Sequence, residues 1–99
     1  MKNVDTIVAI STANGNAAVG IIRVSGPKTT DICRHYFGEV QPRYAKYVKI
    51  KDNEIVIDDA IVIRYVAPSS YTGEDMLEIQ MHGNQILLER FQEILCKKY

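Results

Sequence analysis

The chain has no excess of charge of either sign, no tryptophan and no long apolar run. Twelve Lys and Arg residues balance twelve Asp and Glu residues among 99. The isolated chain therefore lacks the long-range positive field that draws a protein to nucleic acid or to an anionic membrane, and an RNA partner would need other segments. The apolar run Ile7 to Ile10 is too short for a signal peptide, and no stretch approaches the roughly twenty apolar residues of a membrane span. We expect a cytoplasmic protein.

Cysteine and phosphate-binding motifs are also scarce. Cys33 and Cys96 lie far apart in the sequence, and neither belongs to a Cys-x-x-Cys pair. Reduced, packed thiols are therefore expected, without a metal site. The sequence also lacks a Gly-x-x-x-x-Gly-Lys-Ser/Thr loop, so we expect no GTP, Mg²⁺ or K⁺ site in this chain.

The segments that are present predict one small α+β domain over residues 1–99, a mixed sheet of about five strands with two helices packed on it. Strands are expected at 5–11, 18–25, 44–51, 54–57, 60–66 and 77–82, with a turn at 12–16 and a tight hairpin at Asp52 and Asn53. Pro27 is expected in the first turn of a helix that runs to about Phe37 and stops at Gly38. A second helix opens near Asn84, and its apolar stripe is Leu87, Leu88, Phe91, Ile94 and Leu95.

A loop rich in hydroxyl side chains runs from Pro68 to Asp75 and leads directly into a strand with one polar face. Side chains alternate along a strand, so Glu78, Gln80 and His82 share one side, while Leu77, Ile79 and Met81 share the other. A polar platform backed by an apolar core, next to such a loop, suits recognition of a small polar ligand.

Several polar residues have competing interpretations. Arg23 lies in a row of apolar side chains and either contacts a ligand or pairs across the sheet with an acid such as Glu78. Glu78 itself is either a ligand-binding carboxylate or a solvated strand residue. The adjacent residues Glu74 and Asp75 point opposite ways on a strand, which favours a turn or cap role over acid–base chemistry. His82 has no second ligand at metal spacing, so a structural or helix-entry role is expected.

Three blocks of the sequence together resemble a known family. They are Asp5 to Thr12, then Gly20-Ile21-Ile22-Arg23-Val24-Ser25-Gly26-Pro27, then Ser70-Tyr71-Thr72-Gly73-Glu74-Asp75 with Glu78 and His82-Gly83. In this order and spacing they are similar to the N-terminal domain of the tRNA modification GTPases called MnmE or TrmE. The resemblance spans nearly the whole chain.

The resemblance implies a domain that binds 5-formyltetrahydrofolate or a related tetrahydrofolate and forms a homodimer. In that setting Glu78 would accept the paired N–H donors of the pterin, and Arg23 would donate to the ligand's carbonyl or carboxylates. Tyr71 would either stack on the ligand or serve as a packing lid. The full-length family protein acts on the wobble uridine of tRNA with a partner of the MnmG type, so tRNA and that partner are expected only through the longer protein.

Departures from the family pattern keep other functions open. The further strand that follows the second helix in the family, with its ligand-contacting Lys, is missing, and we expect a domain shortened relative to the family, without the GTPase domain. No catalytic residue or metal ligand is assigned, and this chain alone is expected to have no catalytic activity. The alternatives are a stand-alone folate-dependent one-carbon transferase and a structural dimerisation domain without a ligand.

Overall fold

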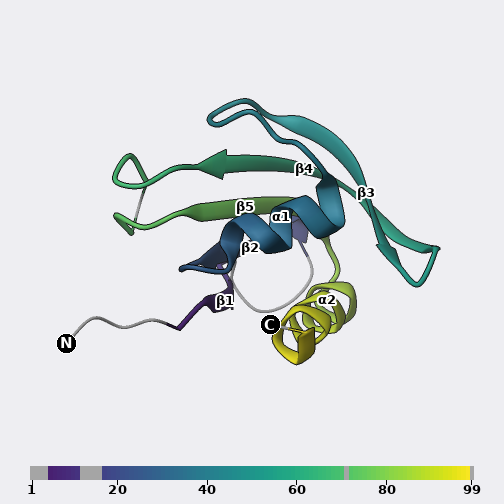
Figure 1. The fold of residues 1–99 in the computed structure, drawn as a ribbon. Helices are drawn as coiled ribbons and strands as arrows, with labels where there is room; N and C mark the ends of the chain where they lie inside the picture. The colour runs from purple at the N-terminus through teal and green to yellow at the C-terminus, as the bar shows by residue number, and fades with distance from the viewer. Residues whose placement is uncertain (1–4, 12–16, 71, 99) are drawn as a thin grey trace.

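The computed structural model describes residues 5–11, 17–70 and 72–98 of the chain. Figure 1 shows an extended sheet crossed by one helix, with the other helix beside it and a long hairpin reaching past both. The strands are β1 (Ile7–Ile10), β2 (Ala17–Ser25), β3 (Lys46–Asp52), β4 (Ile55–Tyr65) and β5 (Met76–Gly83), and the helices are α1 (Thr29–Phe37) and α2 (Gln85–Lys98).

The sheet confirms the predicted α+β class and the five strands, but its pairing is not mixed. The strand order is β1-β2-β5-β4-β3, and every pairing between these strands is antiparallel. The reason is the connectivity. Hairpins join β3 to β4 and β4 to β5. The crossover from β2 through α1 leads to β3 at the far edge of the sheet, so these two strands are not neighbours. A parallel pair would need a crossover between neighbouring strands.

The strands expected at 54–57 and 60–66 form a single strand, β4. The pairing of β3 with β4 shifts its register between Ile50 and Lys51, so β4 continues through the residues between the two predicted segments. The hairpin turn lies one residue later than predicted, because Asn53 and Glu54 both have positive φ, at 49° and 70°. Two central residues with positive φ form a type I′ turn, whose twist matches that of the paired strands.

Both helices pack on one face of the sheet and form a single core with it. Buried side chains of this core come from β2, β3, β4, β5 and both helices. Tyr36 of α1 meets Phe91 of α2 edge to face, with ring centroids 5.5 Å apart. Gly20 lets α2 approach β2, since a Cβ at this position would lie 2.6 Å from a methyl carbon of Leu88. The predicted apolar stripe of α2 is confirmed: Leu88, Phe91 and Leu95 are buried, and Leu87 and Ile94 pack against the core.

The helix ends follow the local sequence. Helix α1 begins at Thr29, two residues after the position predicted from Pro27, and ends as predicted at Gly38, whose φ is 73°. The side chain of Asn84 caps α2 by accepting the backbone N–H groups of Ile86 and Leu87 at 2.9 and 3.2 Å. No helix in the described part of the chain is long and apolar enough to cross a membrane.

Neither helix of the described residues lies over the opposite face of the sheet, and we call it the open face. Strand register places these side chains on it: Ile7 and Ala9 of β1, Val19, Ile21, Arg23 and Ser25 of β2, Tyr47 and Lys49 of β3, Asp59, Ile61, Ile63 and Tyr65 of β4, and Met76, Glu78 and Gln80 of β5. Met76 is fully buried although it lies outside the core cluster. The loop after β4 turns back over this end of the face, where Thr72 and Ser25 share a hydrogen bond between hydroxyls at 2.7 Å.

The two edges of the sheet are protected differently. Ser11 donates its N–H to the Ile21 carbonyl at 2.8 Å, so by antiparallel alternation the Val8 carbonyl points away from β2. Gln92 of α2 donates its side-chain amide to that carbonyl at 3.1 Å. The other edge strand, β3, carries Lys46, Lys49 and Lys51, and such charges discourage the addition of another strand.

Candidate ligand-binding site

The centre of the open face brings together the two residues singled out by the sequence. The antiparallel register sets Arg23 of β2 directly opposite Glu78 of β5. On the other side of β5, Ile63 of β4 is the residue opposite Glu78. Side chains opposite one another in antiparallel strands lie about 4.5–5.5 Å apart at Cβ, so an ion pair between Arg23 and Glu78 follows from the strand pairing.

Both oxygens of the Glu78 carboxylate are engaged. Arg23 donates from Nε and Nη2 to Oε1, each at 3.2 Å. Gln80, which follows Glu78 on the same face, donates its amide to Oε2 at 2.9 Å. One of the two interpretations of Arg23, pairing with Glu78 across the sheet, is therefore present in the structure. Contact of either residue with a ligand remains a prediction.

Glu78 is buried although it lies on the open face, with only 6% of its surface exposed. Its neighbours Ile63 and Arg23 account for this, because both lie directly across from it in the adjoining strands. A carboxylate shielded from water makes stronger hydrogen bonds than an exposed one. A ligand that presents paired N–H groups would have to displace Gln80 or Arg23, both of which are side chains that can move.

The loop between β4 and β5 is tied down by its own polar groups. Asp75 accepts the Ala67 N–H at 2.9 Å, and Ser70 donates its hydroxyl to the Glu74 carbonyl at 2.5 Å. Gly73 has a φ of 79°, a left-handed conformation that glycine adopts without strain. These contacts confirm the turn role predicted for Glu74 and Asp75. Tyr71 lies outside the described residues, so its two interpretations stand as predictions.

His82 has a partner that the sequence did not point to, Asp58. The Asp58 carboxylate accepts the His82 backbone N–H at 2.9 Å and lies 2.6 Å from Nδ1 of its ring. It also accepts the N–H of Asp59 at 2.8 Å. Because these bonds join β4 to the end of β5, they support the structural role predicted for His82. Periodicity gave no signal for Asp58, which is separated from His82 by 24 positions.

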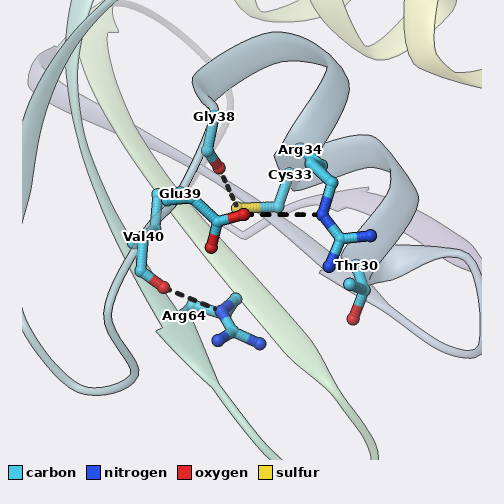
Figure 2. Close-up of a pocket in the computed structure, with 7 residues that line it drawn as sticks. All are labelled: Thr30, Cys33, Arg34, Gly38, Glu39, Val40 and Arg64. Carbon is cyan, nitrogen blue, oxygen red and sulfur yellow. Dashed lines mark hydrogen bonds and ion pairs between the residues drawn. The ribbon is translucent and has the colours of Figure 1, made fainter.

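A small hollow lies at the end of α1, on the helix side of the sheet (Figure 2). Its volume is about 30 Å³, enough for one or two water molecules. Figure 2 shows Arg64 donating to the Val40 carbonyl, at 2.9 Å, and Arg34 facing Glu39 across 3.7 Å. Both cations thus bind the segment that follows α1, while Lys46 donates to the Phe37 carbonyl at the end of the helix at 3.0 Å.

The thiol of Cys33 lines this hollow and is buried, as predicted, whereas Cys96 is exposed, contrary to the expectation of packing. Burial raises the pKa of the Cys33 thiol, and the charges of Arg64 and Lys46 oppose that effect. A thiol with a raised pKa is protonated at neutral pH and is a poor nucleophile. The hollow is therefore part of the packing of α1.

A second ion pair lies on the open face, between strands β3 and β4. Lys49 and Asp59 are opposite one another in register and form an ion pair at 3.2 Å. A hydrogen bond from Tyr47 and then one from Lys49 lower the pKa of Asp59. The same carboxylate raises the pKa of Lys49. Both groups are water-exposed, so this pair adds little to stability and gives the face a polar rim.

Sequence comparison places this arrangement in a family. The chain matches the family described as GTP-binding protein TrmE N-terminus over residues 6–99. It is 42% identical to the tRNA modification GTPase MnmE of Caldicellulosiruptor saccharolyticus, over 94% of this chain and 22% of that protein. The proteins of the same name from Shewanella sp. (strain MR-7) and Coxiella burnetii (strain Dugway 5J108-111) are 49% and 40% identical, over 86% and 94% of this chain and 19% and 21% of theirs.

The chain thus spans about a fifth of the length of the curated relatives it matches. The match covers the strands of the open face, the loop before β5 and both helices. The chain belongs to the family of the TrmE, or MnmE, N-terminal domain.

Proposed function

We propose that this chain is the folate-binding and dimerisation module of a tRNA modification GTPase that acts at the wobble uridine. The ligand class is a reduced folate such as 5-formyltetrahydrofolate, which carries a one-carbon unit when bound. The observation that carries the proposal is Glu78, a nearly buried carboxylate at the centre of the open face. GTP hydrolysis, tRNA and a partner of the MnmG type belong, in this proposal, to the longer protein.

The residues around Glu78 fit the ring of a pterin. That ring presents an amide N–H beside an exocyclic amino group, and one carboxylate accepts both as a charge-assisted pair. Glu78 now receives such donors from Arg23 and Gln80. A pterin would replace one of these donors with its own, while the half-exposed Arg23 is placed to donate to an oxygen of the ligand. Ile21 and Ile63 flank the position and give the flat ring apolar contacts.

Isothermal titration of the chain with 5-formyltetrahydrofolate tests this assignment. Glu78→Gln keeps the shape of the side chain but replaces one acceptor with an N–H, so it should weaken binding by about tenfold to 150-fold, or roughly 1.5–3 kcal/mol. Glu74→Gln is the matched control, because Glu74 is an exposed carboxylate in the neighbouring loop, and it should bind like the wild type. A folded Glu78→Gln protein with unchanged affinity would show that the pterin is bound elsewhere.

Dimerisation is supported by the apolar side chains of the open face. Ile7, Val19, Tyr47 and Ile61 are exposed on this one face, although a small monomer usually scatters such residues singly. A second copy placed against the face would bury all four and would remove the central ion pair from water. We therefore propose a symmetric homodimer that forms through the open face.

Sedimentation velocity distinguishes the dimer from a monomer. Ile61→Glu puts a charge in the proposed interface and should raise the dimer dissociation constant by about tenfold or more. Ile86→Glu is the control, since Ile86 is an exposed isoleucine on α2, away from the open face, and it should leave the dimer unchanged. A dimer without folate binding would support the structural dimerisation alternative, and a monomer for the wild type at high concentration would rule out the interface.

A further inference from the structure

A hollow of about 390 Å³ lies at one end of the open face and is separate from Glu78. Its lining residues are Arg43, Tyr65, Pro68, Ser69 and Ser70. The lining contains one cation and, among the described residues that form it, no carboxylate. The hollow therefore combines a positive charge with hydroxyl groups and one aromatic ring.

The backbone of Arg43 is held in an unfavourable conformation at this hollow. Its φ of 68° is in the left-handed region, where a residue with a Cβ is disfavoured and Gly or Asn is common. Its N–H donates to the Arg64 carbonyl at 2.8 Å, which fixes the turn against the end of β4. Strained backbone that persists in a folded protein is often found at ligand-binding sites. The arginine at this position, which suits Gly or Asn, indicates that its side chain has a role that offsets the unfavourable backbone.

Two contacts aim the Arg43 side chain at the hollow. Its guanidinium carbon lies 5.8 Å from the centroid of the Tyr65 ring, within the range of a cation–π contact. Its Nη1 donates to the Ser69 carbonyl at 3.3 Å. Neither partner is an acid, so neither neutralises the charge. A guanidinium held in this way has the planar donor geometry that binds a carboxylate with two parallel hydrogen bonds.

The hollow and Glu78 lie along the same strand pair. Ile63 is opposite Glu78, and Tyr65, two residues further on β4, is opposite Met76. Two residues of a strand advance about 7 Å. One end of this stretch offers a carboxylate that accepts N–H donors, and the other end offers a cation that binds an acid. A ligand with a donor-bearing ring at one end and a carboxylate at the other matches both.

We propose that Arg43 binds the carboxylate end of the ligand whose ring is held by Glu78, an inference that rests on the proposed function. In a reduced folate this end is the glutamate, joined to the pterin through an aminobenzoyl group. The Tyr65 ring, which lies beside Arg43 and lines the hollow, offers a surface for the linking group. Arg43 is thus a specificity residue, which distinguishes a pterin with an acidic tail from one without.

Titration of the chain with two ligands tests this assignment. The first is 5-formyltetrahydrofolate, and the second is 5-formyl-6-methyltetrahydropterin, which lacks the aminobenzoyl-glutamate. Arg43→Asn removes the charge and keeps a residue that tolerates positive φ, so it should weaken binding of the first ligand about three- to tenfold. Binding of the second ligand should not change. Arg43→Lys retains the charge without the planar donors, so its affinity for the first ligand should be intermediate.

Thermal unfolding supplies the second readout. Because Asn relieves the strained backbone, Arg43→Asn should keep or raise the unfolding temperature, although it weakens the binding of 5-formyltetrahydrofolate. Arg34→Gln is the control, since Arg34 is an exposed cation on α1, across the sheet, and it should leave both affinities unchanged.

Three results would count against the assignment, and they differ in what they reject. Equal losses for both ligands, or a loss of stability that accompanies the loss of binding, would make Arg43 a structural residue. Unchanged affinity of Arg43→Asn for 5-formyltetrahydrofolate would reject the tail site and leave the proposed function intact. A wild type that binds neither ligand would reject the proposed function, and this inference with it.

Discussion

The helix-covered face of the sheet is lined with aliphatic and sulfur-containing side chains, while the open face has an ion pair at its centre and apolar side chains in contact with water. The same strands supply both. In β5, Leu77, Ile79 and Met81 are buried against the helices, and Glu78 and Gln80 alternate with them on the other side. Core packing and the proposed ligand binding therefore depend on alternate residues of one strand, so a substitution can change one of them without the other.

Two isoleucines compare the faces most directly. Ile79 is fully buried on the covered face, and Ile61 is 42% exposed on the open face. Ile79→Ala should lower the free energy of unfolding by about 2–5 kcal/mol, because it leaves a cavity in the core. Ile61→Ala should cost about 1 kcal/mol or less in the monomer. Urea denaturation at low protein concentration measures both values.

A similar loss of stability for both variants would mean that the open face is already covered in the folded protein. Repeating the denaturation over a range of concentrations would then show whether a second copy covers it, since the stability of a dimer rises with concentration.

The central ion pair is the next point of comparison. Arg23→Met removes the ion pair and leaves the Glu78 carboxylate with the hydrogen bond from Gln80 at 2.9 Å. This change should cost about 1–3 kcal/mol, moderated because the Arg23 side chain is 39% exposed. Adding Glu78→Leu should restore stability to near the wild-type value, since an apolar pair of similar size often replaces a buried ion pair without loss. Chemical denaturation of the single and double variants would contradict this if the second change made the protein less stable still.

The smallest effect concerns the rim of the open face. The lowered pKa of Asp59 means that its contribution to stability is present above its usual value of 3.8 and is lost as the pH falls through the lowered value. Tyr47→Phe and Lys49→Met should each raise the Asp59 pKa toward 3.8, because each removes a hydrogen bond to this carboxylate and Lys49→Met also removes a positive charge. Carbon-13 NMR of the carboxyl group follows each titration. An unchanged Asp59 pKa in Tyr47→Phe would show that the phenol does not hold this carboxylate.

The sequence predicted the faces of the strands better than it predicted their neighbours. Alternation correctly assigned Glu78 to the polar side of its strand and Arg23 to the row that it shares with Ile21, and the apolar stripe of α2 was equally clear. The burial of Glu78 could not be predicted, because it depends on β5 lying between β2 and β4, with Ile63 in register. The alternation of side chains along one strand shows which residues share a face, but it does not show which residues of the neighbouring strands lie opposite them.

The same limit explains the remaining differences. Asp58 meets His82 only because β4 and β5 are adjacent, and no local pattern marks it. The mixed sheet was wrong because the destination of the crossover through α1 is set by packing between distant segments. Arg43 carried no sequence signal of its own, since positive φ at an arginine is visible only in the folded backbone.

The protected edges of the sheet limit how copies of this chain can associate. With Gln92 covering the Val8 carbonyl at one edge and lysines along β3 at the other, the sheet is a poor template for the addition of further strands. Edge-to-edge addition would have no natural end and leads to fibres, whereas a pairing of like faces about a two-fold axis is complete after one partner. The amide of one glutamine and the charges of one strand thus favour a closed assembly over an open-ended one.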